Sequence, residues 1–214
     1  MIEKLAIVKK AAAAKRLLVV PALLGAGLLA TGLVSLLAVS LIGYEQTHGA
    51  AATDRSKADA VVDADGNLRV PANYRSTYQF LGTWAVAADA SQGSQELHVV
   101  YASPGTIAAY RKDGHFPDGS VLVKEVFEAE TGAMTTGTVS HARTLQGWFV
   151  MVKDRNNSHP DNPLWGDGWG WSWFDAANPS ETTSTDYGAD CKGCHVPAEA
   201  TEWVYVEGYP PLKR

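Results

Sequence analysis

Hydrophobic and polar positions form three different patterns along this chain, and each pattern predicts a different kind of element. The first is an apolar run from 17 to 43, LLVVPALLGAGLLATGLVSLLAVSLIG, which contains no charged residue. A helix of about 20 residues spans the hydrocarbon core of a bilayer, so this run predicts one N-terminal transmembrane helix. The basic residues in 1–16 predict a cytoplasmic N-terminus and export of the rest of the chain. Cleavage as a signal peptide is the alternative, because small residues occur around 49–52.

The second pattern has helical spacing and occurs at two places after a polar tether at 44–63. The stretch 71–81, PANYRSTYQFL, begins with proline and repeats its apolar residues at helical intervals, which predicts a helix. The stretch 103–114, SPGTIAAYRKDG, predicts a second, short helix, with Ser103 as its N-cap and Gly114 as its C-cap.

The third pattern is the alternation of β-strands, and it dominates the rest of the chain. It predicts strands at 96–102, 120–130, 138–145, 147–155 and 168–176. Gly132 is expected to begin a turn, and Gln146–Gly147 is expected to join two strands of a hairpin. The prediction is therefore an α+β domain at 64–214, mostly antiparallel sheet with a few packed helices.

The last predicted strand, GWGWSWFDA, places three tryptophans on one face and small residues on the other. A tryptophan-packed core is one interpretation. The other is that a flat cofactor approaches the face made by Gly168, Gly170 and Ser172, because glycine in a strand often marks a close approach to the backbone.

Charge is distributed unevenly and excludes one class of partner. Residues 1–43 hold five basic residues and one acidic residue, whereas the remainder holds 13 basic and 22 acidic residues, a net charge of −9. Nucleic-acid binding depends on neutralising phosphates with Lys and Arg, so the acidic domain is not expected to bind nucleic acid.

Both cysteines of the chain lie in one short motif, DCKGCH at 190–195. A redox dithiol of the C-x-x-C type belongs at the start of a helix in a βαβ unit, and no parallel-sheet pattern surrounds this motif. Zinc requires four ligands, and the motif supplies three at most. Covalent haem is the third interpretation and the favoured one: Cys191 and Cys194 attach one haem c per chain, and His195 ligates the iron.

A second axial ligand for the iron is not apparent from the sequence. Met151 lies in an apolar strand, where core packing explains it, and Met134 lies in a predicted turn. An open iron position predicts binding or chemistry at the metal. Plain electron transfer, which usually adds a Met or His ligand, is the less favoured class.

The domain resembles the cytochrome P-460 family, which includes the cytochrome c′-beta proteins. The resemblance rests on NYRSTYQFLGTW, HVVYASPGTIAAYRKDGHFPDGSVLVKE, NPLWGDGWGWSWFD and DCKGCH, and covers about 66–210. It implies a predominantly β fold, often dimeric, around a five-coordinate haem c. The enzymatic members oxidise hydroxylamine to nitrous oxide by way of nitric oxide, whereas the cytochrome c′-beta members bind small gases.

The resemblance also implies roles for three further residues. Lys124 matches the lysine that the enzymatic members bond covalently to the haem ring. Asp186 matches a carboxylate on the distal side of the iron, where it would accept protons from the substrate. Phe80 is a candidate for the aromatic distal wall, although ordinary core packing is its simpler interpretation.

These residues lead to one preferred function and one alternative. The preferred function is oxidation of hydroxylamine by a haem protein anchored in the inner membrane, with its domain in the periplasm and its electrons passed to a carrier such as a periplasmic cytochrome c. The alternative is a non-catalytic protein that binds, senses or detoxifies nitric oxide. Signal cleavage would make either one a soluble periplasmic protein, and a homodimer is compatible with both.

Overall fold

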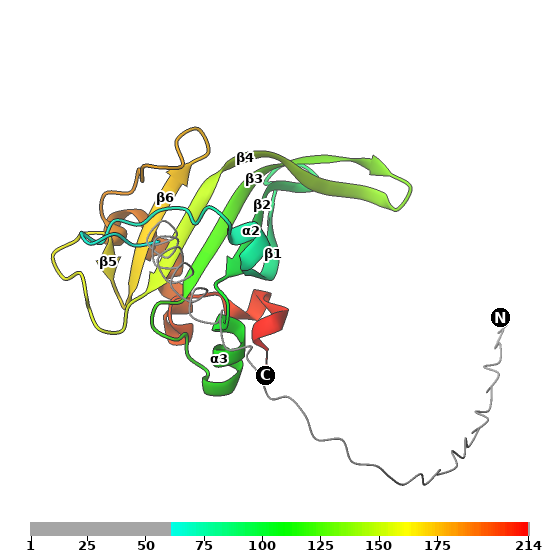
Figure 1. Ribbon diagram of the computed structural model, residues 1–214. Coiled ribbons are helices and arrows are strands. Elements are labelled where there is room, and N and C mark those ends of the chain that lie inside the picture. Colours follow the sequence, from blue (N-terminus) through cyan, green and yellow to red (C-terminus); the bar gives the residue numbers. More distant parts are fainter. Residues whose placement is uncertain (1–60, 214) are drawn as a thin grey trace, which may run out of the picture. The chain divides into compact units, whose positions relative to one another are not determined.

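The computed structural model describes residues 61–213, which form an antiparallel sheet with short helices at one end (Figure 1). The predicted cytoplasmic segment 1–16, the transmembrane helix 17–43 and most of the tether 44–63 lie outside the described residues. Among the residues that are described, no helix is long and apolar enough to cross a membrane.

One six-stranded sheet makes up most of the domain, in the order β1-β2-β3-β4-β6-β5 with every neighbouring pair antiparallel. This confirms the predicted α+β class with a mostly antiparallel sheet. The strands are β1 (Gln79–Ala87), β2 (Ser94–Ala102), β3 (Val121–Met134), β4 (Gly137–Lys153), β5 (Trp165–Gly166) and β6 (Trp169–Asp175).

Helices are few and short. The helix α2 (Tyr74–Thr77) precedes β1, and α3 (Thr106–Asp113) lies between β2 and β3. After β6 the chain forms a series of helical turns, which we call the C-terminal segment: η1 (Gly188–Lys192), α4 (Gly193–His195), η2 (Val196–Thr201), η3 (Val206–Gly208) and η4 (Pro210–Leu212).

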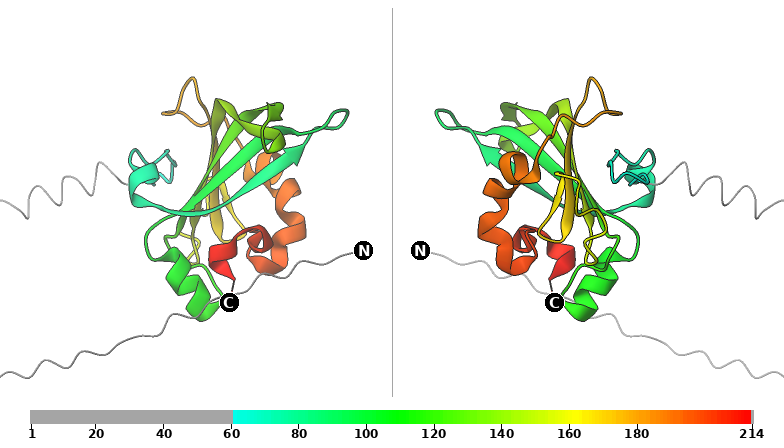
Figure 2. Two further views of the ribbon diagram at one scale, coloured as in Figure 1. Left: turned by 90° about the vertical axis from the view of Figure 1, so that its right-hand side faces the viewer. Right: turned by 90° about the vertical axis from the view of Figure 1, so that its left-hand side faces the viewer.

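Different parts of the chain cover the two faces of the sheet (Figure 2). The C-terminal segment packs against the face that we call the inner face, where its Trp203 and Val204 join a core cluster with Leu122, Met151 and Trp171. The segment 61–78 covers the other, outer face, where a second cluster holds Leu68, Tyr74, Val121, Val123, Val150, Val152, Leu164, Trp165 and Phe174. Side chains of a strand alternate between faces, so β3 and β4 contribute to both clusters.

The helix expected at 71–81 is wrong for most of its length. Only the single turn of α2 is helical. The next residue, Tyr78, is extended, and β1 begins at Gln79. The sequence from Gln79 alternates between the two faces: Leu81 enters the inner core cluster while Phe80 opposes Tyr101 across the strand pair. The aromatic residues had helical spacing, but pairing with β2 determined the structure.

The hairpin expected around Gln146–Gly147 is also wrong. β4 runs without a break from Gly137 to Lys153, and its turn with β3 lies between Met134 and Gly137, so Gly132 lies within a strand. A Cβ atom at Gly147 would lie 2.1 Å from the carbonyl oxygen of Phe174 and 2.6 Å from the Trp173 ring. Glycine is therefore required at 147 by the close approach of β6, not by a turn.

The short helix expected at 103–114 is confirmed as α3, but its N-cap differs. Gly114 closes the helix in the left-handed conformation (φ 78°), as its position predicts. The N-cap is Gly105. Ser103 instead accepts a hydrogen bond from the backbone N–H of Val121 through its Oγ at 3.0 Å, which ties the loop before α3 to the start of β3.

Candidate functional site

A cavity of about 700 Å³ lies between the inner face of the sheet and the C-terminal segment. This volume is within the range of roughly 300–1,000 Å³ that is common for small-molecule and cofactor sites. The cavity brings together four of the six residues that the sequence nominates: Lys124 from β3, and Cys191, Cys194 and His195 from the C-terminal segment. Its remaining wall is mostly apolar and aromatic, with Trp84, Val100, Leu122, Phe149, Met151, Trp171, Trp173, Val204, Tyr205 and Tyr209.

The cysteine motif lies on consecutive helical turns, from the π-helical turn η1 into α4. Cys191 is buried and Cys194 is exposed, and the two thiols are not joined. Burial is the main reason that the pKa of Cys191 rises, to about 11. A redox dithiol needs a lowered cysteine pKa, and the sheet is antiparallel, so the dithiol interpretation is not supported.

His195 has one ring nitrogen committed and one available. Its Nδ1 lies 2.6 Å from the carbonyl oxygen of Trp203. A carbonyl only accepts, so Nδ1 donates and the neutral ring leaves Nε2 with a free lone pair. Histidine ligands of metals are commonly oriented by this kind of hydrogen bond. Burial lowers the pKa of His195, which favours the neutral form that can bind iron.

The carbonyl of Trp203 is held by an unusual backbone turn. Glu202 and Trp203 both adopt left-handed conformations, with φ of 56° and 67°, which non-glycine residues rarely occupy. The Glu202 carboxylate accepts hydrogen bonds from the Phe116 N–H at 2.8 Å and forms an ion pair with the buried Lys153 at 3.1 Å. The Glu202 carbonyl accepts a third bond, from the indole N–H of Trp169 at 2.9 Å. These contacts hold the turn that positions the acceptor of His195.

Lys124 projects from the middle of the sheet into the cavity. Its Nζ lies 4.3 Å from the centre of the Phe149 ring. Burial lowers the pKa of Lys124, and this effect outweighs the opposing influence of Cys194, Glu96 and Cys191. A lysine with a lowered pKa holds more of the neutral amine, which is the nucleophilic form.

β6 contributes mostly its tryptophan face to the cavity, although Ser172 of the small face also borders it. Trp171 and Trp173 are part of the wall, and the Trp171 ring meets the His195 ring edge-on at a centroid distance of 4.9 Å. Gly170 itself is covered by protein: a Cβ atom there would lie 2.8 Å from the Trp165 ring. A cofactor approaching Gly170 and its neighbours was therefore the wrong interpretation of these glycines.

Two nominated residues do not line the cavity. Phe80 is 53% exposed, and its ring meets Tyr101 at a centroid distance of 6.1 Å. Asp186 is exposed, and its carboxylate accepts a hydrogen bond from the Ala189 N–H at 2.9 Å at the start of the C-terminal segment.

Besides Gln146, Ser172 and Asp190, two polar residues of β2 that the sequence analysis did not nominate line the cavity, Glu96 and His98. His98 Nε2 lies 2.9 Å from the Glu96 carboxylate. A signal for them was present in the sequence, because the alternation of ELHVV places Glu96, His98 and the buried Val100 on one face. Charged and polar residues on a face that also carries core residues indicate a site.

A zinc site is not supported either. Within residues 61–213, no group of three or more His, Cys, Asp or Glu side chains is placed to hold a metal ion. His195 has Trp171 and Tyr205 as its ring neighbours, so the C-terminal segment presents one imidazole and two thiols to the cavity.

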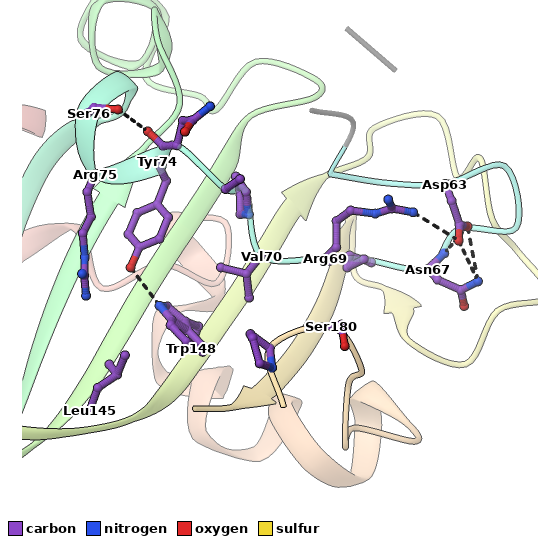
Figure 3. Close-up of a pocket in the computed structure, with 15 residues that line it drawn as sticks. Asp63, Asn67, Arg69, Val70, Tyr74, Arg75, Ser76, Leu145, Trp148 and Ser180 are labelled. Carbon is purple, nitrogen blue, oxygen red and sulfur yellow. Dashed lines mark hydrogen bonds and ion pairs between the residues drawn. The ribbon is translucent and has the colours of Figure 1, made fainter. Parts of the chain in front are cut away.

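A larger cavity, about 860 Å³, lies on the outer face beside Tyr74 and Trp148 (Figure 3). Tyr74 accepts a hydrogen bond from the Trp148 indole at 2.8 Å and donates one to the buried carboxylate of Glu125. Arg75 reaches the same carboxylate at 2.5 Å. The residues described there include no cysteine or histidine, so the smaller cavity is the candidate site despite its size.

Comparison with protein families agrees with this choice. The Cytochrome P460 family model matches residues 71–206, which contain the sheet, the cysteine motif and all of the cavity wall except Tyr209. The chain belongs to the cytochrome P460 family. As a cytochrome it is a haem protein. Among curated proteins, none matches the chain.

The residues of this cytochrome fit a haem in the inner-face cavity. The volume is sufficient for a cofactor, the wall is largely aromatic, and the cavity holds a histidine with a free Nε2. Gly193, between the two cysteines, has open space where a side chain would be. The imidazole and the two thiols of the C-terminal segment suit haem c, so Cys191, Cys194 and His195 are the residues that would hold it.

Proposed function

We propose that this protein is a c-type haem enzyme that oxidises hydroxylamine at an open iron position and passes the electrons to a carrier protein. The observation that supports it is the meeting of Lys124 with Cys191, Cys194 and His195 in one cavity. The haem would supply a redox-active metal, while the chain supplies orientation, exclusion of water and proton transfer.

The proposed role of Cys191 and Cys194 is covalent attachment of one haem. Helical geometry places residues three apart on the same side, which suits bonds to two neighbouring vinyl groups. His195 would be the axial ligand. Its Nδ1 bond to Trp203 fixes the ring, so Nε2 would be presented to the iron with little loss of freedom.

The second axial position is proposed to be open. Met151 is the methionine of the cavity wall, and it pairs directly with Trp171, the residue against which His195 packs. It therefore lies at the level of the proposed proximal ligand and not across the cavity from it. Met134, at the tip of the β3–β4 hairpin, is 64% exposed.

Lys124 is proposed to bond the haem ring at its edge, where one N–C bond would replace an amine N–H and a ring C–H bond and the two electrons released would pass to the oxidised carrier protein. The lowered pKa of its amine favours the neutral, reactive form. Phe149 packs beside the amine and restricts where it can point. The role of Asp186 as the proton acceptor stays a prediction. Its carboxylate lies at the surface and accepts a hydrogen bond from the Ala189 N–H.

The environment of the enzyme is proposed from the N-terminal sequence. Residues 17–43 would anchor it in the inner membrane with the domain in the periplasm, near a periplasmic electron acceptor such as a cytochrome c. Cleavage of the segment would leave a soluble periplasmic protein with the same site, and a homodimer is compatible with either form.

The experiment is the optical spectrum of the dithionite-reduced, haem-loaded protein, followed by turnover of hydroxylamine with an oxidised electron acceptor. We expect a strongly red-shifted Soret band that disappears in Lys124→Ala and persists in Lys112→Ala, a control lysine exposed on α3. Haem that remains with the chain on a denaturing gel, and is lost when both cysteines are replaced by alanine, tests the covalent attachment.

An ordinary high-spin spectrum without hydroxylamine turnover would contradict the enzyme and favour the second candidate, a nitric oxide binding protein. The apolar and aromatic wall of the cavity is the observation that favours this candidate, since capture of a small neutral gas needs only an open iron and an apolar pocket.

A further inference from the structure

The pairing of strands orders the inner-face side chains into successive rows across the cavity. Leu122 lies opposite Met151, which lies opposite Trp171, and His195 packs on that row. Lys124 is in the next row, opposite Phe149. Rows on one face are two residues apart along a strand, or about 7 Å.

His98 belongs to the row after Lys124, opposite Val126, and Glu96 lies one row further. Proceeding along the strands, the order is therefore His195, then Lys124, then His98 and Glu96. Along the strands, the imidazole of His195 therefore lies on one side of Lys124 and His98 lies on the other. If Lys124 marks the edge of the haem, as proposed above, the two histidines lie on opposite sides of that edge.

We propose that His98, oriented by Glu96, is the base that takes up protons from a small molecule bound at the open haem position. This inference rests on the open haem site of the proposed function. It assigns proton transfer to residues of β2 that line the cavity, whereas Asp186 is at the surface.

The hydrogen bond between the pair sets the tautomer of His98. The Glu96 carboxylate accepts, so Nε2 of His98 carries the proton and the neutral ring has a free lone pair on Nδ1. Among the described residues, no hydrogen bond to this Nδ1 is formed. A carboxylate that holds one nitrogen of an imidazole while the other takes a proton is the arrangement of many catalytic histidines.

The charges around His98 support the same assignment. Burial lowers the pKa of His98, with the bond to Glu96 opposing and Lys124 from β3 contributing to the decrease, so the ring is a neutral acceptor at pH 7. On β1 the neighbour opposite is the apolar Trp84. The further acid on β3, Glu128, is exposed and faces Arg143 of β4 at 4.0 Å.

The chemistry requires such a base. Oxidation of hydroxylamine to nitric oxide releases three protons and three electrons. The electrons would pass one at a time to oxidised carrier proteins, and the protons need an acceptor within reach of the nitrogen and oxygen of the substrate. His98 would take them singly and return each to water, since its side chain is 18% exposed.

The test uses two probes of the oxidised, haem-loaded full chain, followed by stopped-flow absorbance of the Soret band. Hydrogen cyanide is protonated at pH 7 and must lose its proton on binding ferric haem. Azide is already an anion at that pH and needs no base. General-base assistance is typically worth at least about 100-fold.

We expect His98→Gln to slow cyanide association by about 100-fold while azide association stays as in the unmodified protein. Glu96→Gln should slow cyanide less, because the base remains but loses its orientation. His141→Gln, on the exposed part of β4, is the matched control and should change neither rate. Equal Soret spectra and haem content show that the variants hold the haem alike.

Unchanged cyanide association in His98→Gln would overturn the proposal. Equal slowing of cyanide and azide would also overturn it, because His98 would then control access and not proton transfer. Failure of the unmodified protein to bind either probe would refute the open site itself. Slowed cyanide binding in a protein that does not oxidise hydroxylamine would retain the base and remove only the proposed substrate.

Discussion

The ion pair between Glu202 and Lys153 allows a quantitative test of how the C-terminal segment is held. The Lys153 side chain is 6% exposed, and its Nζ lies 3.1 Å from the Glu202 carboxylate. At this separation, with an effective dielectric constant of about 20, the attraction between unit charges is about 5 kcal/mol. This is an upper limit, because desolvation of both groups opposes it.

Glu202→Gln removes the charge and keeps the shape of the side chain. Its amide oxygen can still accept from the Phe116 N–H, so the main loss is the charge that compensates a buried ammonium. We expect the free energy of unfolding to fall by about 2–4 kcal/mol. For a domain of this size, this lowers the melting temperature by roughly 4–16 °C.

The pH dependence gives a second, independent measurement. Burial alone would raise the pKa of Glu202, but the Phe116 N–H and Lys153 outweigh it and hold the pKa below its ordinary value of 4.5. A lowered carboxylate pKa contributes stability that is fully present above the unfolded pKa and is lost as the pH falls through the folded pKa. The difference between the two proteins should therefore be full at pH 7 and shrink below pH 4.5.

The assay is thermal unfolding of the haem-loaded protein, followed by far-ultraviolet circular dichroism at several pH values. Glu199→Gln, an exposed change in the same segment, is the control and should shift stability by less than about 0.5 kcal/mol. Equal melting temperatures for Glu202→Gln and the unmodified protein, or a difference that persists undiminished at pH 3, would refute this account of the ion pair.

Three further predictions concern packing and the limits of the site. Gly147→Ala should lower stability by about 1–3 kcal/mol or more, as expected for an overpacked core, whereas Gly132→Ala in β3, with open space around it, should be close to neutral in the same denaturant titration. Tyr74→Phe should cost about 1–3 kcal/mol, because it leaves a buried carboxylate and an indole N–H each short of one hydrogen bond; a loss below 0.5 kcal/mol would count against this network. Phe80→Ala should leave the Soret spectrum and the rates of cyanide and azide binding unchanged, and a change in either rate would place its ring at the cavity after all.

The sequence predicts mainly those elements and motifs that depend on the pattern of contiguous residues. The cysteine motif, the sheet-dominated fold, β2, α3 and β6 follow from spacing and alternation in contiguous residues. Lys124 follows from the family resemblance alone.

The remainder depended on contacts between distant segments. The turn predicted at Gly147 is wrong because the reason for this glycine, the close approach of the β6 backbone at Phe174, comes from 27 residues further along the chain. The left-handed turn at Glu202 has no local signature, since it is stabilised by Lys153 and Phe116. The alternation of ELHVV places His98 on the same face as Val100, but only the completed sheet shows that this face lines a cavity.

The irregular pairing near Phe127 divides the β3–β4 pair into a part that lines the cavity and a part that forms the hairpin end. Without it, a change of length in one part would shift the register of the other. Lys124 and Glu125 are adjacent but face opposite sides, so a shift of one residue in β3 would exchange an amine for a carboxylate in the cavity. The register changes between Val126 and Ala129, beyond both residues. Insertions or deletions in the β3–β4 hairpin beyond Ala129 can therefore be absorbed at this point, so the hairpin can vary in length while the cavity keeps Lys124.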